Sequence, residues 1–221
     1  MKYFVVPALA LLIISSSYAQ ISKIDFVLGP NISFARGSDL NKDFWDSRIS
    51  VTGGVGVDYS VTNNSSITIK VLYENKGFIR TDKINYTDEN NIPVEVNATI
   101  KLNIAYINVP LLYGYRFGNK IKFNVEAGPY LGIYLYDNLS ADIEGLSSVE
   151  AAQLNSNTTD FGLCLGFNAY FPVSNKLSLK AGLQDYLGLN DISGDSSFFG
   201  ALKSNTLALQ LGISLNLDSS I

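Results

Sequence analysis

The fold is decided by residues 120–136, which read KIKFNVEAGPYLGIYLY. Apolar side chains stand at odd positions such as Ile121, Val125 and Leu135, while the even positions carry polar residues, tyrosine or glycine. An alternation of period two is typical of a β-strand whose two faces meet different surroundings. The segment therefore predicts an amphipathic strand.

Seven further stretches alternate in much the same way, so the chain contains eight candidate strands. Glycine, asparagine and serine are frequent on one face of these stretches, and aliphatic or aromatic residues dominate the other face. The other seven candidate strands are residues 23–35, 49–61, 66–80, 99–117, 159–172, 176–188 and 204–217.

The connections between these strands are short and long in turn. Outer-membrane barrels have short periplasmic turns and long extracellular loops, whereas a soluble barrel has no reason to sort its connections in this way. We therefore expect an all-β fold, an eight-stranded antiparallel up-and-down transmembrane β-barrel. The short connections are residues 62–65, 117–120 and 173–176, and the long ones are roughly 36–48, 81–98, 137–158 and 190–203.

The apolar face is expected to point outward, towards lipid, because a closed barrel satisfies its own backbone polar groups in a membrane. The small polar face suits the narrow interior of eight strands. Aromatic residues on the apolar face predict interfacial girdles near both ends of the barrel. Their candidates are Phe26, Tyr59, Phe117, Phe123 and Phe171 at the short-turn end, and Phe34, Tyr73, Tyr106 and Phe161 at the other.

Charged residues share the polar face, so they are expected to point into the lumen. Buried charges are tolerated only when they are paired and hydrogen-bonded. We predict that these residues form a salt-bridged plug with a structural role, and the alternative is a hydrated pore lining. The predicted lumen-facing charged residues are Asp25, Asp58, Lys70, Glu74, Lys101, Arg116, Glu126 and Lys180.

The alternation changes phase within residues 99–117. Apolar residues stand on even numbers up to Tyr106 and on odd numbers from Ile107 onward. A β-bulge shifts an alternation by one residue, and Pro110 cannot donate a hydrogen bond to a neighbouring strand. We therefore predict a bulge near residues 106–110.

The first nineteen residues predict a cleaved secretory signal. Lys2 supplies a positive start, an apolar stretch follows, and Ser17 and Ala19 provide the small residues of a cleavage site. The predicted division is a signal peptide over residues 1–19 and one outer-membrane barrel domain over residues 20–221. The expected location is the outer membrane of a Gram-negative cell.

The composition excludes several classes of function. The net charge is −4 and the basic residues do not cluster, which argues against a nucleic-acid partner. Histidine is absent, and with it the commonest general base and metal ligand. We therefore expect no catalytic residues, no bound metal and no cofactor. Cys164 is the one cysteine, which predicts a small buried residue.

The long loops are acidic and rich in asparagine, but their spacing matches no calcium-binding loop. Phe44 and Trp45 stand among charges in the first of these loops. Exposed, they would anchor a partner protein; folded over the mouth of the barrel, they would form a lid. The sequence leaves both alternatives open for this candidate loop contact.

Five stretches follow one another along nearly the whole mature chain. They are Asn75-Lys76-Gly77-Phe78, Tyr106-Ile107-Asn108-Val109-Pro110-Leu111-Leu112-Tyr113, Glu126-Ala127-Gly128-Pro129-Tyr130, Asp160-Phe161-Gly162 and Tyr186-Leu187-Gly188-Leu189-Asn190-Asp191-Ile192. Taken together in this order, they resemble the PorT-like outer-membrane β-barrel family of Bacteroidota. The resemblance implies an outer-membrane location and a small closed barrel. The functions of that family are mostly undefined, although its namesake takes part in a secretion and gliding apparatus.

The favoured function is that of a non-catalytic barrel, surrounded by outer-membrane lipid, which acts through its extracellular loops as a structural or partner-binding part of the envelope. One alternative is a narrow porin-like conduit. Another is a secreted, soluble, lipocalin-like barrel that binds an apolar ligand, which requires the apolar face to point inward. The loop partner and the oligomeric state stay open.

Overall fold

The computed structural model of the chain describes residues 20–38, 44–87, 93–144, 149–151, 156–193 and 201–217. The predicted signal peptide lies outside these residues. No helix in the described part of the chain is long and apolar enough to cross a membrane. The strands are β1 (Gln20–Gly37), β2 (Asp46–Ser60), β3 (Ser65–Thr87), β4 (Pro93–Phe117), β5 (Lys122–Ile143), β6 (Val149–Ala151), β7 (Thr159–Pro172), β8 (Leu177–Gly188) and β9 (Leu202–Asn216).

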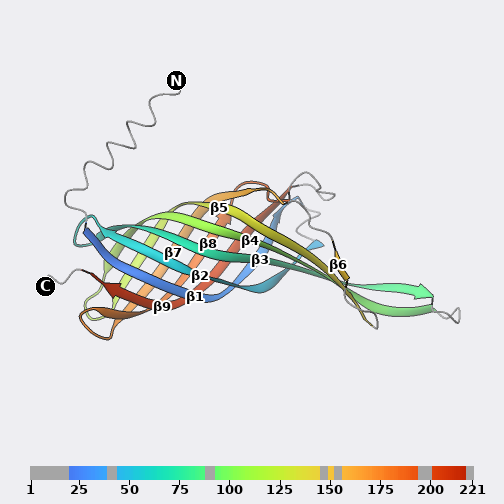
Figure 1. Cartoon of the computed structure of the whole chain (residues 1–221), viewed down its shortest axis with the longest axis horizontal. Coiled ribbons are helices and arrows are strands. Elements are labelled where there is room, and N and C mark those ends of the chain that lie inside the picture. The colour runs from blue at the N-terminus through green and yellow to red at the C-terminus, as the bar shows by residue number, and fades with distance from the viewer. Residues whose placement is uncertain are drawn as a thin grey trace, which may run out of the picture.

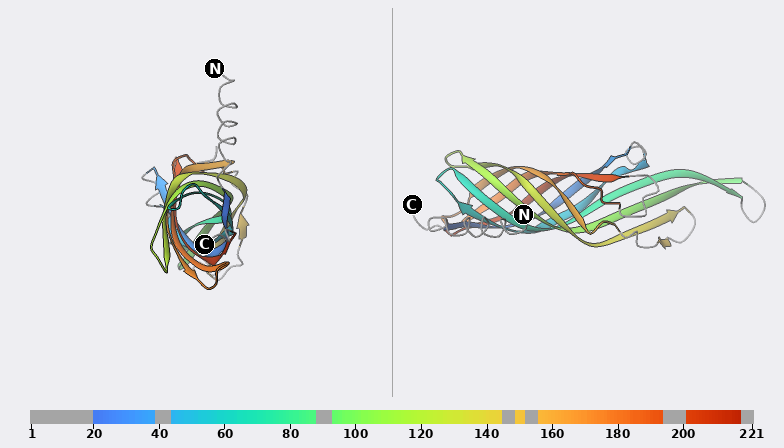
Figure 2. Two further views of the ribbon diagram at one scale, coloured as in Figure 1. Left: turned by 90° about the vertical axis from the view of Figure 1, so that its left-hand side faces the viewer. Right: turned by 90° about the horizontal axis from the view of Figure 1, so that it is seen from above.

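Eight of these strands close into an antiparallel up-and-down barrel (Figures 1 and 2). Each strand pairs with its neighbour in the chain, and β1 pairs with β9 to complete the ring, for example Phe26 with Ile213. The short strand β6 is the exception, since it pairs only with the outer part of β5, for example Leu139 with Ala151. The predicted fold class is confirmed.

The short turns lie at the end of the barrel where β1 begins and β9 ends. In the β2–β3 turn the hydroxyl of Thr62 accepts a hydrogen bond from the backbone N–H of Ser65, at 3.0 Å. In the β4–β5 turn Gly118 adopts φ +94°, a conformation that side-chain-bearing residues rarely take. Short turns therefore make all three connections at this end, as predicted.

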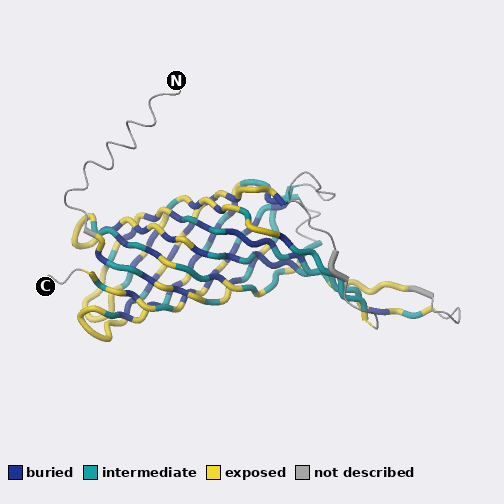
Figure 3. Tube along the Cα trace, viewed as in Figure 1, coloured by how far each residue is buried: buried dark blue, intermediate teal, exposed yellow. Residues whose placement is uncertain are grey.

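The outer surface of the barrel is apolar and the interior is polar. Leu28 is 68 % exposed on the outside, whereas Lys70 on the inside is 1 % exposed. Buried and exposed positions alternate along each strand in Figure 3. This is the inverted arrangement that the sequence predicted, and it is the opposite of what a soluble barrel with an apolar ligand site requires.

Three strands continue well beyond the rest of the barrel and form a projecting blade (Figures 1 and 2). We define the blade as residues 80–87, 93–103 and 137–143, from β3, β4 and β5 respectively. Strands β3 and β4 stay paired out to Thr87 and Pro93. Much of the predicted loop 81–98 is therefore strand, because its threonine, valine and isoleucine residues suit a paired ribbon. Part of the predicted loop 137–158 is strand as well, in β5 and β6.

The predicted bulge in β4 is wrong. Strand β4 keeps one register with β3 along its whole length, and the irregularity lies on β5, where Leu135 is the extra residue opposite Ala105 and Tyr106. Even-numbered residues of β4 consequently face inward on both sides of this point. The apolar residues move from even to odd positions because the inner face is apolar in the blade and polar in the barrel. The backbone of β4 continues regularly through this point.

Candidate functional site

The interior of the barrel is filled by ion-paired side chains. Near the short turns lies a lower layer, which we define as Asp25, Asp58, Arg116 and Lys180. The ammonium of Lys180 lies 2.6 Å from Asp25 Oδ2, and the guanidinium of Arg116 pairs with Asp58. The hydroxyl of Tyr170 also donates to Asp25, at 3.3 Å. Two acids thus face two bases, so the layer is balanced in charge.

A middle layer consists of Lys70, Glu126 and Gln184. Lys70 Nζ and Gln184 Nε2 both donate to Glu126 Oε1, each at 2.5 Å. The other carboxylate oxygen of Glu126 accepts a hydrogen bond from Asn124, and Tyr186 donates to Gln184 at 2.6 Å. The three residues of the layer are at most 1 % exposed, so one buried acid is matched by one buried base.

An upper layer consists of Glu74, Lys76 and Asp160, each with a fully buried side chain. The ammonium of Lys76 donates to Asp160 and, at 2.8 Å, to the hydroxyl of Ser204. Glu74 Oε1 lies 3.6 Å from the same ammonium. The hydroxyl of Tyr130 donates to Asp160 at 3.0 Å. Here two acids face one base.

Above the upper layer, an apolar mouth cluster closes the interior. Asp191 positions one of its members, Ile192, because Asp191 Oδ1 accepts hydrogen bonds from the backbone N–H of Leu202, at 2.8 Å, and from Ser193. Side chains at this level point into the interior and are buried from solvent. The mouth cluster consists of Phe78, Leu102, Ile104, Tyr106, Ile192 and Leu202, with Ala35, Trp45, Tyr134 and Leu139 packed against it.

Six of the eight predicted lumen-facing charges lie inside the barrel with at most 2 % of the residue exposed. Arg116 is partly exposed at the short-turn end, in its pair with Asp58. The expectation for Lys101 is wrong: it stands on the outer face of the blade, 35 % exposed, and pairs with Asp142 at 2.5 Å. The six are Asp25, Asp58, Lys70, Glu74, Glu126 and Lys180.

Two charged residues of the upper layer, Lys76 and Asp160, were missed among the predicted sites. The signal was available in the alternation, since Lys76 has the same parity as Lys70 and Glu74 on its strand, and Asp160 precedes the inward-facing Gly162 by two residues. The inward-facing tyrosines that hydrogen-bond to these layers were missed as well. Alternation places a side chain on a face, but it does not say which charges meet across the lumen.

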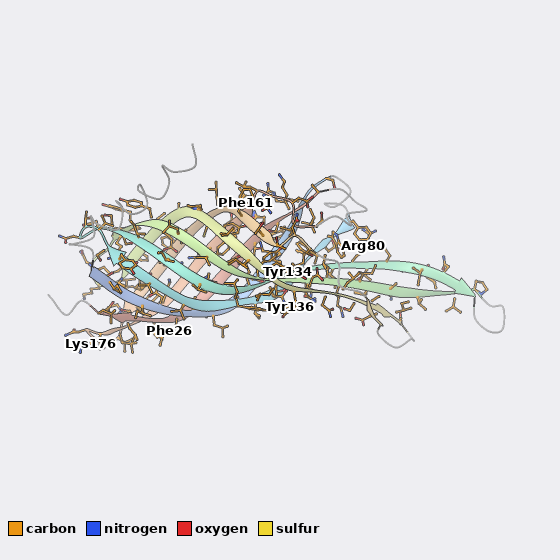
Figure 4. The ribbon with its side chains drawn as sticks, turned by 45° about the horizontal axis from the view of Figure 1, so that its top comes forward. Phe26, Arg80, Tyr134, Tyr136, Phe161 and Lys176 are labelled. Carbon is orange, nitrogen blue, oxygen red and sulfur yellow. The ribbon has the colours of Figure 1, made fainter. Side chains whose placement is uncertain are left out.

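Phe44 and Trp45 lie against the mouth of the barrel. The Trp45 ring packs on Phe78 with the ring centres 6.3 Å apart and meets Phe44 edge to face at 5.0 Å. Arg80, labelled in Figure 4, lies over the Phe44 ring at 4.9 Å. Both aromatic residues are only partly exposed, which matches the lid alternative rather than a freely exposed anchor.

Aromatic residues ring the outer surface near both ends. At the short-turn end the rings of Phe117, Phe123 and Phe167 stack with centres 5.6 and 5.8 Å apart. At the foot of the blade, where Figure 4 labels Tyr136, the hydroxyls of Tyr73 and Tyr136 lie 2.9 Å apart. Tyr106 was predicted for the upper girdle, but it faces inward and is fully buried. Strand β4 has no bulge in its register with β3, so its even-numbered residues face inward throughout.

The described residues contain no group of three or more histidine, cysteine, aspartate or glutamate side chains placed to hold a metal ion. Cys164 is buried in the lumen, 3.9 Å from Gln184 Oε1. On the blade, the hydrogen bond from Arg80 holds the pKa of Asp82 below its ordinary value.

The barrel resembles solved outer-membrane proteins in fold. Ail, the attachment invasion locus protein of Yersinia pestis, is 11 % identical with a TM-score of 0.41, over 88 % of this chain and 99 % of Ail. OprG of Pseudomonas aeruginosa is 10 % identical with a TM-score of 0.45, over 89 % and 96 %. Neisserial surface protein A is 16 % identical with a TM-score of 0.40, over 86 % and 96 %.

A comparison with curated proteins gave no match. The family model described as outer membrane protein beta-barrel domain matches residues 18–194, which is most of the chain. The matched range begins just before β1 and ends after β8, so it takes in all three layers of the lumen. The chain belongs to the outer membrane protein beta-barrel domain family.

Proposed function

We propose that this protein is a non-catalytic component of the outer membrane whose barrel is a sealed anchor and whose blade and loops form its working surface. In this proposal residues 1–19 are a signal peptide that is cleaved on export. The resemblance to PorT-like proteins of Bacteroidota supports a role beside other envelope proteins, and the barrel would carry no flux of solutes.

The main support for a sealed barrel is that side chains fill its lumen. A conducting pore needs a continuous aqueous path, and an eight-stranded barrel has just enough interior for side chains. Here that interior holds ion pairs at three levels, such as Lys70–Glu126 at 2.5 Å. The mouth cluster then places apolar side chains across the extracellular end. If the lumen carries no solute, the function must depend on contacts that the blade and loops make with partners.

Among the described residues, the blade projects furthest from the barrel (Figure 2). Its outer face is polar and carries paired charges, including Lys83 with Glu95 at 2.6 Å and Lys101 with Asp142. A rigid sheet costs less conformational entropy to bind than a disordered loop does. This supports the blade as the surface that a partner recognises.

Conductance tests the sealed barrel. Residues 20–221 are refolded in detergent, checked by the difference in mobility between boiled and unboiled samples, and added to planar bilayers. We expect the heat-dependent mobility shift and no channel steps. Regular single-channel steps from the unmodified protein would refute the sealed lumen and favour the narrow porin-like conduit.

Cross-linking in whole envelopes tests the blade. In a trimmed variant, residues 81–99 are replaced by Asn-Gly, which joins Arg80 to Ile100, a pair already opposite each other in the sheet. The trimmed variant should keep the mobility shift but lose the cross-linked partners of the full chain. Equal cross-linking of the two proteins would show that the blade is not the binding surface.

A further inference from the structure

The upper layer differs from the two layers below it in its charge. The lower layer holds two carboxylates and two cations, and the middle layer holds one of each. In the upper layer the two carboxylates of Glu74 and Asp160 face the single ammonium of Lys76. Lys23 lies over the ring of Tyr170 near the lower layer, too far along the barrel to offset this difference. One negative charge is therefore left over.

Four acceptor oxygens at this level receive no hydrogen bond from the protein. Two belong to Glu74, one is Asp160 Oδ1 and one is Asn108 Oδ1. All three residues are fully buried. A buried carboxylate without donors carries a large desolvation penalty. The amide nitrogen of Asn108 is also unpartnered here, but one amide cannot serve all of these oxygens and carries no charge to offset a carboxylate. The region therefore still needs a positive group.

The register of the sheet brings these oxygens together. Asp160 pairs with Gly132, and Gly132 pairs with Asn108, so the three residues lie in one row across β7, β5 and β4. A Cβ atom at Gly132 would lie 2.6 Å from Asn108 Oδ1 and 3.2 Å from Asp160 Cβ. The side chains of Asn108 and Asp160 therefore both lie over Gly132, where a larger residue would hold them apart. Glu74 lies 3.6 Å from the ammonium that pairs with Asp160.

We propose that the upper layer binds one alkali cation, sodium or potassium, between Glu74, Asn108 and Asp160. Carboxylate and amide oxygens are the ligands that hard cations take. A single positive charge balances the carboxylate of this layer that Lys76 leaves uncompensated. The cation completes the plug at its upper level and enters as the barrel closes, because the side chains enclose it.

Refolding in matched salts tests the site. The protein is refolded in sodium chloride, potassium chloride or choline chloride at one ionic strength, and the temperature midpoint of the mobility shift is measured. We expect a higher midpoint in sodium or potassium than in choline, with a saturable dependence on cation concentration. Glu74→Gln should abolish this difference, and its midpoint in choline should be no lower than that of the unmodified protein.

Two further variants separate the site from general effects. Glu126→Gln neutralises an equally buried acid in the balanced middle layer, so it should lower the midpoint in every salt and keep the cation dependence. Asn108→Leu removes one oxygen ligand and leaves both acids. The rise of the midpoint with cation concentration should therefore occur at higher concentrations than in the unmodified protein. Asn108→Leu also tests the site if Glu74→Gln does not refold.

Crystals grown in rubidium chloride give a direct readout, namely an anomalous scattering peak between the three oxygen-bearing side chains. Equal midpoints in all salts, or an equal cation effect in Glu74→Gln, would overturn the proposal. So would a midpoint that depends on pH but not on the cation and becomes independent of pH in Glu74→Gln, since a proton would then supply the charge.

Discussion

The blade continues three strands of the barrel wall, yet the faces of the two regions are opposite in chemistry. Within the barrel β3 presents Ile69 outward and Lys70 inward. On the blade the neighbouring strand β4 presents Lys101 outward and buries Leu102. The β3–β4 register is unbroken between these two regions. The medium around the strand therefore decides which face is apolar, and the backbone does not.

The change occurs beside the outward-facing tyrosines Tyr73 and Tyr136, of which Tyr136 is labelled at the foot of the blade in Figure 4. Tyrosine prefers the boundary between hydrocarbon and water, where its ring and its hydroxyl both find suitable surroundings. In a member of an outer-membrane barrel family, we therefore expect this level to mark the outer edge of the hydrocarbon, with lipid around the strands below it and water around them above.

The largest expected difference between the two regions concerns their ion pairs. Glu126→Gln leaves the buried ammonium of Lys70 without its partner and should cost about 3–5 kcal/mol of unfolding free energy. Glu95→Gln breaks the pair with Lys83, in which the two side chains are 54 % and 69 % exposed, and should cost less than about 1 kcal/mol. Urea unfolding in lipid vesicles measures both, and equal losses would contradict the comparison.

Substituting a lysine on the outer face of β3 tests directly whether lipid or water surrounds that part of the strand. Ile69→Lys places a charge in the lipid-facing part of β3 and should cost about 2–4 kcal/mol if it lies near the bilayer midplane. Asn85→Lys places the same charge on the same face of β3 in the blade and should change stability by no more than about 0.5 kcal/mol. The same vesicle assay applies. A large loss at Asn85 would mean that the blade also contacts lipid.

Packing at the mouth should have an intermediate effect. Trp45→Ala removes a half-buried ring from Phe78 and should cost about 1–2 kcal/mol, less than the roughly 3–5 kcal/mol of a fully buried tryptophan. Trp45 is also the only tryptophan of the chain, so its fluorescence reports this position alone. We expect weak quenching by acrylamide. Strong quenching would indicate a freely exposed anchor instead of a lid.

The smallest expected effect is a local titration on the blade. The hydrogen bond from Arg80 favours the charged form of Asp82, so its carboxyl should titrate below the ordinary pKa of 3.8. The ion pair is therefore fully formed above the ordinary pKa, and it is lost as the pH falls through the lowered pKa that Asp82 has in the folded protein. Carboxyl chemical shifts in NMR measure the midpoint. Arg80→Gln should return it to the ordinary value, and an unchanged midpoint would refute the pairing.

Much of the fold could be predicted because it depends on local rules. The pleat turns successive side chains to opposite faces, so alternation alone predicted the strands and placed Lys70 and Glu126 on the inner face. The lengths of the connections predicted the topology and which end carries the short turns. These inferences need no knowledge of which strands meet across the barrel.

The sites that prediction misplaced depend on contacts between distant segments. Tyr106 and Lys101 were assigned to the wrong faces because a phase change in sequence has two causes, a bulge in the backbone or a change of medium, and alternation cannot separate them. Trp45 stands in a loop whose sequence fits a lid and an anchor equally well.

The sequence by itself determined that the protein is an eight-stranded barrel with an apolar exterior and a charged interior, because strand periodicity and loop length are local properties. Only the tertiary structure decided that Lys76 pairs with Asp160, that Glu74 is left without a full partner and that the mouth is closed by apolar side chains. Closure of the ring sets the stagger between strands, and the stagger decides which inward-facing side chains come within reach of one another.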